Sequence, residues 1–99
     1  MAKYDVYRHP SGNGYLVDCQ ANLLSDFNTR FVVPLLSATE TRPRAPRLNP
    51  VLDVDGEPHI LVTQFAGSIA VRLLGEPVAS LIDEDLKINN AIDMLLSGY

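Results

Sequence analysis

Short runs of apolar and β-branched residues, separated by turn-forming residues, fill the first three quarters of the 99-residue chain. Residues 4–8 and 15–19 alternate in part between apolar and polar side chains, and residues 10–14 between them read Pro-Ser-Gly-Asn-Gly. Glycine supplies the positive φ that a tight connection needs, so we predict a β-hairpin here. A second hairpin is predicted around Asp55-Gly56, which lies between two apolar runs within residues 51–65.

Residues 30–36, RFVVPLL, predict a strand, but Pro34 has no N–H to donate to a ladder. This strand should therefore lie at a sheet edge or carry a bulge, with one-sided pairing near Pro34. Residues 68–74 predict a further strand that ends at Gly75. Residues 37–50 contain three prolines and three arginines without periodicity, which predicts an extended, exposed loop.

After Pro77 the pattern becomes helical. Ser80 precedes Asp83 at capping-box spacing, and Gly98 stands where a C-terminal cap uses a glycine. We predict a mainly β (α+β) fold, an antiparallel sheet closed by one C-terminal α-helix, in a single domain over residues 1–99. The apolar face of the helix repeats at steps of three, four and seven, and comprises Leu81, Ile88, Ile92, Leu95 and Tyr99, with Leu96 beside them.

Composition and charge narrow the class of protein. Apolar residues make up 46% and charged residues 20%, as in a soluble globular chain. The net charge of −4 repels phosphate, so we expect no direct binding of nucleic acid by the chain alone. The apolar runs are too short to span a bilayer, and the N-terminus lacks the apolar stretch of a signal peptide. We therefore expect a cytoplasmic protein with no membrane contact.

The candidate chemical groups do not form a catalytic or metal-binding pattern. His9, His59 and the single Cys19 lack the close spacing of zinc ligands, so we expect no metal and no cofactor. Cys19 lies in an apolar run without basic neighbours, which favours a core cysteine over a reactive thiolate. Asp53 and Asp55 share one strand face, but they flank a turn, and solvated acids are favoured over an acid–base pair.

The basic residues Arg42, Arg44 and Arg47 cluster on the predicted loop and are candidates for gripping RNA phosphates. No aromatic residue is interleaved with them to stack bases, which favours a solvated or partner-contacting loop. The residues alone therefore indicate a small β-rich domain that works by binding.

Several segments resemble, in order and over the full length, the CcdB toxins of toxin–antitoxin pairs. Residues 17–24, VDCQANLL, are similar to the family stretch V-D-V-Q-[ST]-D-[IL]-[IL], and residues 30–35 to R-x-V-I-P-L. Pro50-Val51 before the Gly56 hairpin matches in spacing, and a glycine is the penultimate residue in both. The closing matches are Gly75-Glu76-Pro77-Val78 and Asn90-Ala91-Ile92-Asp93.

The resemblance implies a small SH3-like β-barrel with a C-terminal helix, a fold also found in the MazF and Kid toxins, assembled as a two-fold homodimer. It implies a toxin that is not itself an enzyme. Such toxins bind the A subunit of DNA gyrase and trap the cleaved gyrase–DNA complex. A CcdA-like antitoxin would neutralise the toxin and repress the operon jointly with it.

By similarity, the gyrase-binding residues are those of the chain end and the adjacent helix face, together with a pair in the family segment at residues 17–24. They are Leu23, Leu24, Asp93, Leu96, Ser97, Gly98 and Tyr99. Ser97 and Tyr99 stand where the best-known member has Trp and Ile. From periodicity alone, Tyr99 would instead complete the core stripe of the helix.

Two other interpretations stay open. The first is a MazF-like endoribonuclease of the same fold, in which Arg30, Arg42, Arg44 or Arg47 clamps phosphate. The second is a degenerate, non-toxic CcdB homologue that is retained for operon regulation.

Overall fold

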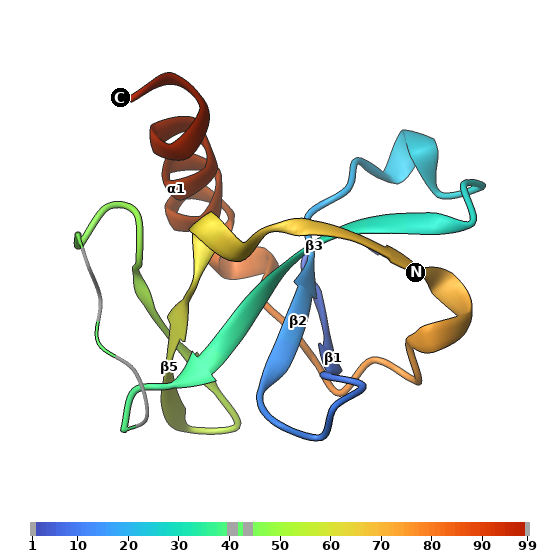
Figure 1. Ribbon diagram of the computed structural model, residues 1–99, viewed down its shortest axis with the longest axis horizontal. Helices are drawn as coiled ribbons and strands as arrows, with labels where there is room; N and C mark the ends of the chain where they lie inside the picture. The colour runs from blue at the N-terminus through green and yellow to red at the C-terminus, as the bar shows by residue number, and fades with distance from the viewer. Residues whose placement is uncertain (1, 40–41, 43–44, 99) are drawn as a thin grey trace.

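The computed structural model describes residues 2–39, 42 and 45–98. These residues form a nearly closed, barrel-like antiparallel sheet with one C-terminal helix, which confirms the predicted fold class (Figure 1). The strands are β1 (Asp5–Arg8), β2 (Tyr15–Asp18), β3 (Thr29–Ser37), β4 (Val51–Val54), β5 (Glu57–Leu61), β6 (Gly67–Ala70) and β7 (Ala79–Ser80). The helix is α1 (Asp85–Ser97), and the 3-10 turns are η1 (Asn22–Leu24), η2 (Thr63–Phe65), η3 (Val71–Leu73) and η4 (Ile82–Glu84).

The sheet follows the order β4-β5-β3-β2-β1-β7, and β6 pairs separately with β3. Both predicted hairpins are confirmed, because β1 pairs with β2 and β4 pairs with β5. The second hairpin turns through Asp55 and Gly56, whose φ values are 53° and 80°. Two successive residues with positive φ match the right-handed twist of the flanking strands.

The prediction that Pro34 lies on an edge strand was wrong, because β3 has partners on both sides. β2 pairs along one side, while the other side is shared by β6, up to Val32, and β5, from Leu35. Pro34 lies between these two ladders, and its carbonyl accepts the N–H of Val62 at 2.9 Å. Its missing donor therefore faces the gap between β6 and β5, so a proline is tolerated in a strand that is paired on both sides, and the expected one-sided pairing near Pro34 was also wrong.

The two faces of the sheet pack differently. Val6, Val17 and Val33 are paired neighbours on one face and belong to a buried apolar cluster that includes Ile88 and Ala91 of α1. Tyr7, Leu16, Asp18 and Arg30 lie on the opposite face, because side chains alternate along a strand, and they are buried as well. The connection between β6 and β7 lies against this second face at Asp5 and Tyr7.

Two predicted boundaries differ from the structure. The predicted strand over residues 68–74 ends at Ala70 and continues as η3. The helix begins at Asp85 after η4, and no side chain caps it. The Ser80 hydroxyl instead accepts the N–H of Ile82 at 3.3 Å, so the predicted capping box is absent.

The C-terminal cap is confirmed, since Gly98 has a φ of 77° and donates its N–H to the Met94 carbonyl at 2.9 Å. The apolar stripe predicted for α1 is only partly correct. Ile88 and Ala91 are buried, whereas Leu95 is 41% exposed in the last turns. The end of α1 therefore leaves the core, and Tyr99 lies outside the described residues.

Candidate functional site

The first candidate surface is the loop of residues 21–28, the η1 loop, in which every side chain is exposed. It carries three large apolar residues: Leu23 is 92% exposed, Leu24 39% and Phe27 55%. Leu23 and Leu24 are residues that the family resemblance assigned to target binding, whereas Phe27 was not predicted. The available signal for Phe27 was one aromatic residue within a polar turn, SDFNT.

Hydrogen bonds at its base hold the η1 loop in place. The Gln20 side chain donates to the carbonyls of Leu24 and Thr29, at 3.0 and 3.1 Å, and accepts the N–H of Phe31 at 3.0 Å. The Asn22 side chain accepts the N–H of Lys3 at 2.8 Å. These bonds satisfy backbone groups that a strand ladder would otherwise pair. The exposed leucines are therefore presented by a fixed backbone.

The second candidate surface is the end of α1, here called the α1 tip, comprising Asp93, Leu96, Ser97 and Gly98. All four residues are exposed, and Leu96 is 76% exposed. The helix ends there because Gly98 adopts the left-handed conformation. Tyr99, the remaining residue that the resemblance assigned to this surface, lies outside the described residues.

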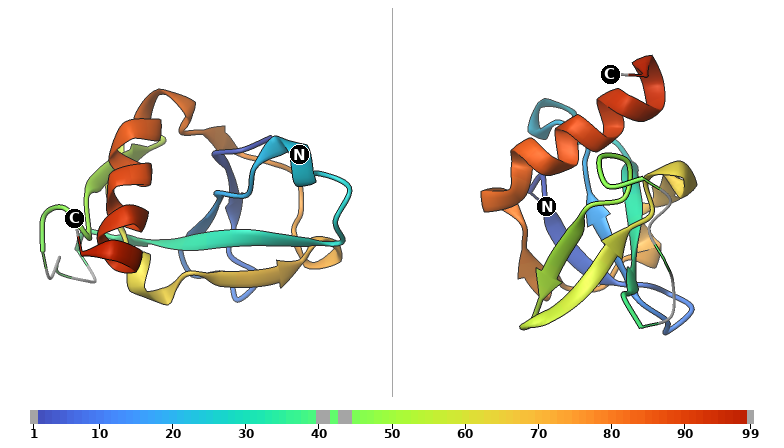
Figure 2. Two further views of the ribbon diagram at one scale, coloured as in Figure 1. Left: turned by 90° about the horizontal axis from the view of Figure 1, so that it is seen from above. Right: turned by 90° about the vertical axis from the view of Figure 1, so that its left-hand side faces the viewer.

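The η1 loop and the α1 tip lie far apart in one chain. They lie on the same side of the molecule but toward opposite ends of its long axis, and the view from above agrees (Figures 1 and 2). The molecule measures 33 × 29 × 22 Å along its principal axes. A single chain therefore does not bring the predicted target-binding residues together.

Arg30, one of the predicted phosphate clamps, lies in the interior. Its side chain and that of Asp18 are fully buried, with Nε and Nη2 of Arg30 at 2.8 and 2.7 Å from one Asp18 carboxylate oxygen. The other carboxylate oxygen accepts the N–H of Gln20 at 3.0 Å. A guanidinium held in this way cannot reach a phosphate of a bound strand.

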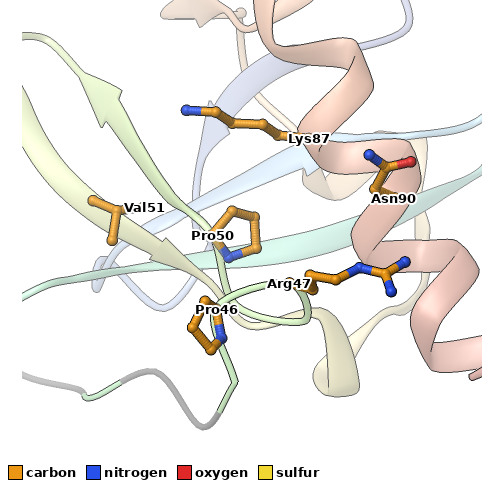
Figure 3. Close-up of a pocket in the computed structure, with 6 residues that line it drawn as sticks. All are labelled: Pro46, Arg47, Pro50, Val51, Lys87 and Asn90. Carbon is orange, nitrogen blue, oxygen red and sulfur yellow. The ribbon is translucent and has the colours of Figure 1, made fainter. Parts of the chain in front are cut away.

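Exposed basic residues border a hollow of about 500 Å³ between α1 and the segment before β4 (Figure 3). The guanidinium of Arg47 points toward α1, and the ammonium of Lys87 extends above Pro50. Lys87 also pairs with Glu84 at 3.3 Å. Arg42 is exposed on the same loop, and Arg44 lies outside the described residues.

The other candidate groups lie where their place in the fold accounts for them. Cys19 is buried, and desolvation followed by the charge of Asp18 raises the pKa of its thiol to about 12, which confirms the core interpretation. His59 is also buried, within the β4–β5 hairpin, and its ring makes an edge contact with the Tyr15 ring at a centroid distance of 5.2 Å. Asp53 and Asp55 are exposed at the hairpin, as predicted.

Within the described part of the chain, no group of three or more His, Cys, Asp or Glu residues is arranged to hold a metal ion. No helix formed by residues 2–39, 42 and 45–98 is long and apolar enough to cross a bilayer.

Comparison with known proteins identifies one family model, described as CcdB protein, which matches residues 3–98. Among solved structures, an endoribonuclease from mycobacterial species is similar, with a TM-score of 0.79, 17% identity, and coverage of 97% of this chain and 90% of that chain. The MazE–MazF structure from Deinococcus radiodurans has a TM-score of 0.68 and 14% identity, and covers 97% of this chain and 93% of that chain. At these identities, the two structures show a shared fold alone.

Proposed function

The chain belongs to the CcdB family of toxins from toxin–antitoxin systems, and from this we propose that it binds the A subunit of DNA gyrase and traps the cleaved gyrase–DNA complex. The toxin makes and breaks no covalent bond in this scheme. Its effect comes from stabilising one state of the target, since anything that binds one state selectively shifts the equilibrium toward it.

The observation that carries this proposal is the exposure of apolar side chains at the η1 loop and the α1 tip. Leu23 and Leu96 are 92% and 76% exposed, although a leucine gains about 1.5–3 kcal/mol from full burial. These large apolar residues are exposed to solvent at positions that match family contact residues. Their exposure supports a role in binding a macromolecule.

We propose that the contact surface is completed by a two-fold homodimer. One chain holds the η1 loop and the α1 tip at opposite ends of its 33 Å axis, so a target that contacts both groups at close range needs two copies. In this arrangement the η1 loop of one protomer lies near the α1 tip of its partner. Two symmetric surfaces then face the target.

A CcdA-like antitoxin would neutralise the dimer and repress the operon jointly with it. The MazE–MazF structure with the same fold is, by its name, a complex, and it supports an antitoxin as partner. The exposed cations Arg42 and Arg47 are available for acidic groups of such a partner.

The alternative of a MazF-like endoribonuclease is favoured by the fold that this chain shares with a mycobacterial endoribonuclease. The burial of Arg30 against Asp18 weighs against it, as does the net charge of −4. Of the predicted phosphate clamps that the structure describes, Arg42 and Arg47 are exposed, and each borders a hollow. A degenerate, non-toxic homologue is the third outcome.

One experiment separates these functions. Purified protein is incubated with gyrase, ATP and supercoiled plasmid, and in parallel with labelled RNA. Linear plasmid released by detergent and protease supports the gyrase poison, and RNA cleavage that Arg42→Ala or Arg47→Ala abolishes supports the nuclease. Antitoxin binding with neither activity identifies the degenerate homologue.

The variant that locates the contact is deletion of Gly98 and Tyr99, with Leu96→Asp as a second change at the α1 tip. We expect both variants to keep the wild-type unfolding midpoint and to lose plasmid linearisation. Val51→Asp is the matched control, since Val51 is likewise an exposed apolar residue, at 48%, but belongs to β4 and to neither surface. Loss of folding in the deletion variant would assign the chain end to the core.

A further inference from the structure

The η1 loop, residues 21–28, lies between β2 and β3 and is light blue in Figure 1. Every side chain in it is exposed, so the loop is not anchored by packing of its own side chains into the core. A loop held only at its ends samples many backbone conformations, and a partner then has to order it on binding. The position of the η1 loop therefore depends on hydrogen bonds.

Gln20 lies where the chain enters the η1 loop, and its single amide group reaches both sides of the loop. Nε2 donates to the carbonyl of Leu24, within the loop, at 3.0 Å and to that of Thr29, at the start of β3, at 3.1 Å. Oε1 accepts the N–H of Phe31 at 3.0 Å. Two acceptors and one donor surround the side chain, so one orientation of the amide satisfies all three groups.

The Leu24 carbonyl links the Gln20 amide to the rest of the loop. This carbonyl also accepts the N–H of Phe27 at 3.1 Å, and the N–H of Leu24 donates to the Ala21 carbonyl at 2.9 Å. The bond from Gln20 therefore holds the point at which η1 joins the turn that carries Phe27. The three large apolar side chains of the loop, Leu23, Leu24 and Phe27, are placed by this connection.

The main chain of Gln20 is fixed by the interior of the protein. Its N–H donates to Oδ1 of Asp18 at 3.0 Å, while Oδ2 of the same carboxylate holds Arg30. Asp18 and Arg30 have no exposed surface. The buried ion pair therefore sets where Gln20 leaves the end of β2, and Gln20 in turn sets the position of the loop.

We propose that Gln20 is the positioning residue of the target-binding surface, and that it holds Leu23, Leu24 and Phe27 in one arrangement before the target binds. This inference rests on the proposed function, because it explains the affinity of the same surface. Preorganisation strengthens binding, since the entropy of ordering the loop is lost on folding and not on association. Phe27 then joins the two leucines as a contact residue.

The first test is amide hydrogen exchange of the full chain, which needs no target. Gln20→Met removes the three hydrogen bonds of the side chain and keeps a similar length. We expect the amides of Leu24 and Phe27 to exchange about tenfold faster than in wild type, because a lost bond favours local opening. The amide of Val33 in the core should change only as far as global stability falls. Unchanged exchange at Leu24 and Phe27 would overturn the proposal.

Gln20→Glu separates the two functions of the amide. At neutral pH a carboxylate still accepts the N–H of Phe31, but it has no hydrogen to donate to the carbonyls of Leu24 and Thr29. We expect the same acceleration at Leu24 as in Gln20→Met. Wild-type exchange in Gln20→Glu would refute the positioning role, and this variant decides alone if Gln20→Met does not fold.

The second test measures plasmid linearisation by gyrase. Gln20→Met should need about tenfold more toxin for half-maximal linearisation. Phe27→Ala should also need more toxin, but it should keep wild-type exchange at Leu24, because it removes a contact and not the support. Thr63→Val is the control for lost stability. The buried Thr63 hydroxyl donates to the Leu48 carbonyl, so this variant loses a side chain–backbone bond outside both surfaces and should keep full activity.

Phe65→Ala is the control for lost aromatic surface, because Phe65 is 67% exposed on η2 and Phe27 is 55% exposed. This variant should linearise plasmid as wild type does. If wild type is active and Gln20→Met is equally active, the positioning role is refuted. If wild type linearises no plasmid, the proposed function fails, and the exchange rates alone decide whether Gln20 positions the loop.

Discussion

Asp18 and Arg30 form an ion pair with no exposed surface, where each charge depends on the other. Removing one partner leaves an uncompensated buried charge, so we expect Asp18→Asn to lower the free energy of unfolding by about 3–5 kcal/mol. The double variant Asp18→Asn with Arg30→Met should recover much of this loss, because neither charge remains. Urea unfolding of the single and double variants measures the difference, and additive losses would show that the two side chains act independently.

The Cys19 thiol makes the stability of the folded chain depend on pH in the alkaline range. Burial raises its pKa from 9.0 to about 12, so above pH 9 the unfolded chain releases a proton that the folded chain retains. This contribution is fully present below pH 9 and is lost as the pH rises toward 12.

We therefore expect the stability advantage of wild type over Cys19→Ala to shrink by about 1 kcal/mol between pH 8 and pH 10. Urea midpoints at the two pH values measure this change. A constant difference would mean that the thiol is accessible to solvent.

The buried ion pair between Asp18 and Arg30 was not predictable from sequence. Asp18 and Arg30 are 12 positions apart and lie in runs that read as ordinary strands, and only the register of β2 against β3 places them together. The exposure of Leu23 and Leu24 was likewise invisible to periodicity, because short apolar pairs read as core. The family resemblance, rather than the pattern, singled them out.

Among the elements, Gly56 and Gly98, two of the glycines with positive φ, offer a matched pair. Their φ values are 80° and 77°, and an added Cβ would meet no atom within 4 Å at either site. Gly56→Ala and Gly98→Ala should therefore each cost about 1 kcal/mol from backbone strain alone. Thermal unfolding of the two variants measures this loss of stability. Unequal losses would show that the residue at one of the two positions contacts another part of the protein.

The same pair separates stability from target binding. If the α1 tip contacts gyrase, Gly98→Ala should reduce plasmid linearisation and Gly56→Ala should not. Equal activity of the two variants would argue against a contact at Gly98.

The hairpin turns and the C-terminal cap, which local signals define, were predicted correctly, whereas the capping box at Ser80 and the features that depend on distant partners were not. The hairpin at Asp55-Gly56 and the cap at Gly98 follow from the conformations of those residues themselves. The environment of Pro34 depends on β5 and β6, which are far along the chain, so sequence alone could not distinguish an edge strand from a gap between two ladders. The early end of β6 has no local signal, since residues 68–74 are uniformly strand-like.

At the scale of the whole molecule, separation of the η1 loop from the α1 tip gives a test of the proposed dimer. Leu23→Asp and Leu96→Asp should each abolish gyrase trapping as homodimers. After mixing and subunit exchange, each mixed dimer contains one unaltered η1 loop beside one unaltered α1 tip, so partial trapping should return. Sedimentation must show twice the mass of the chain for all samples. If trapping does not return in the mixed sample, the η1 loop and the α1 tip do not form one shared contact surface across the dimer.

The pairing of β7 with β1 joins residues 79–80 to residues 5–6, and Ile88 and Ala91 complete the main core. β1 therefore has one of its two neighbours, β7, more than 70 residues away along the chain, and the sheet closes only when residues 79–80 are in place. Contacts between such distant residues slow folding, because a long loop must close before the pairing stabilises it. A chain that stops before residue 79 lacks this strand and both of these core residues of α1, so we expect it to have no stable fold.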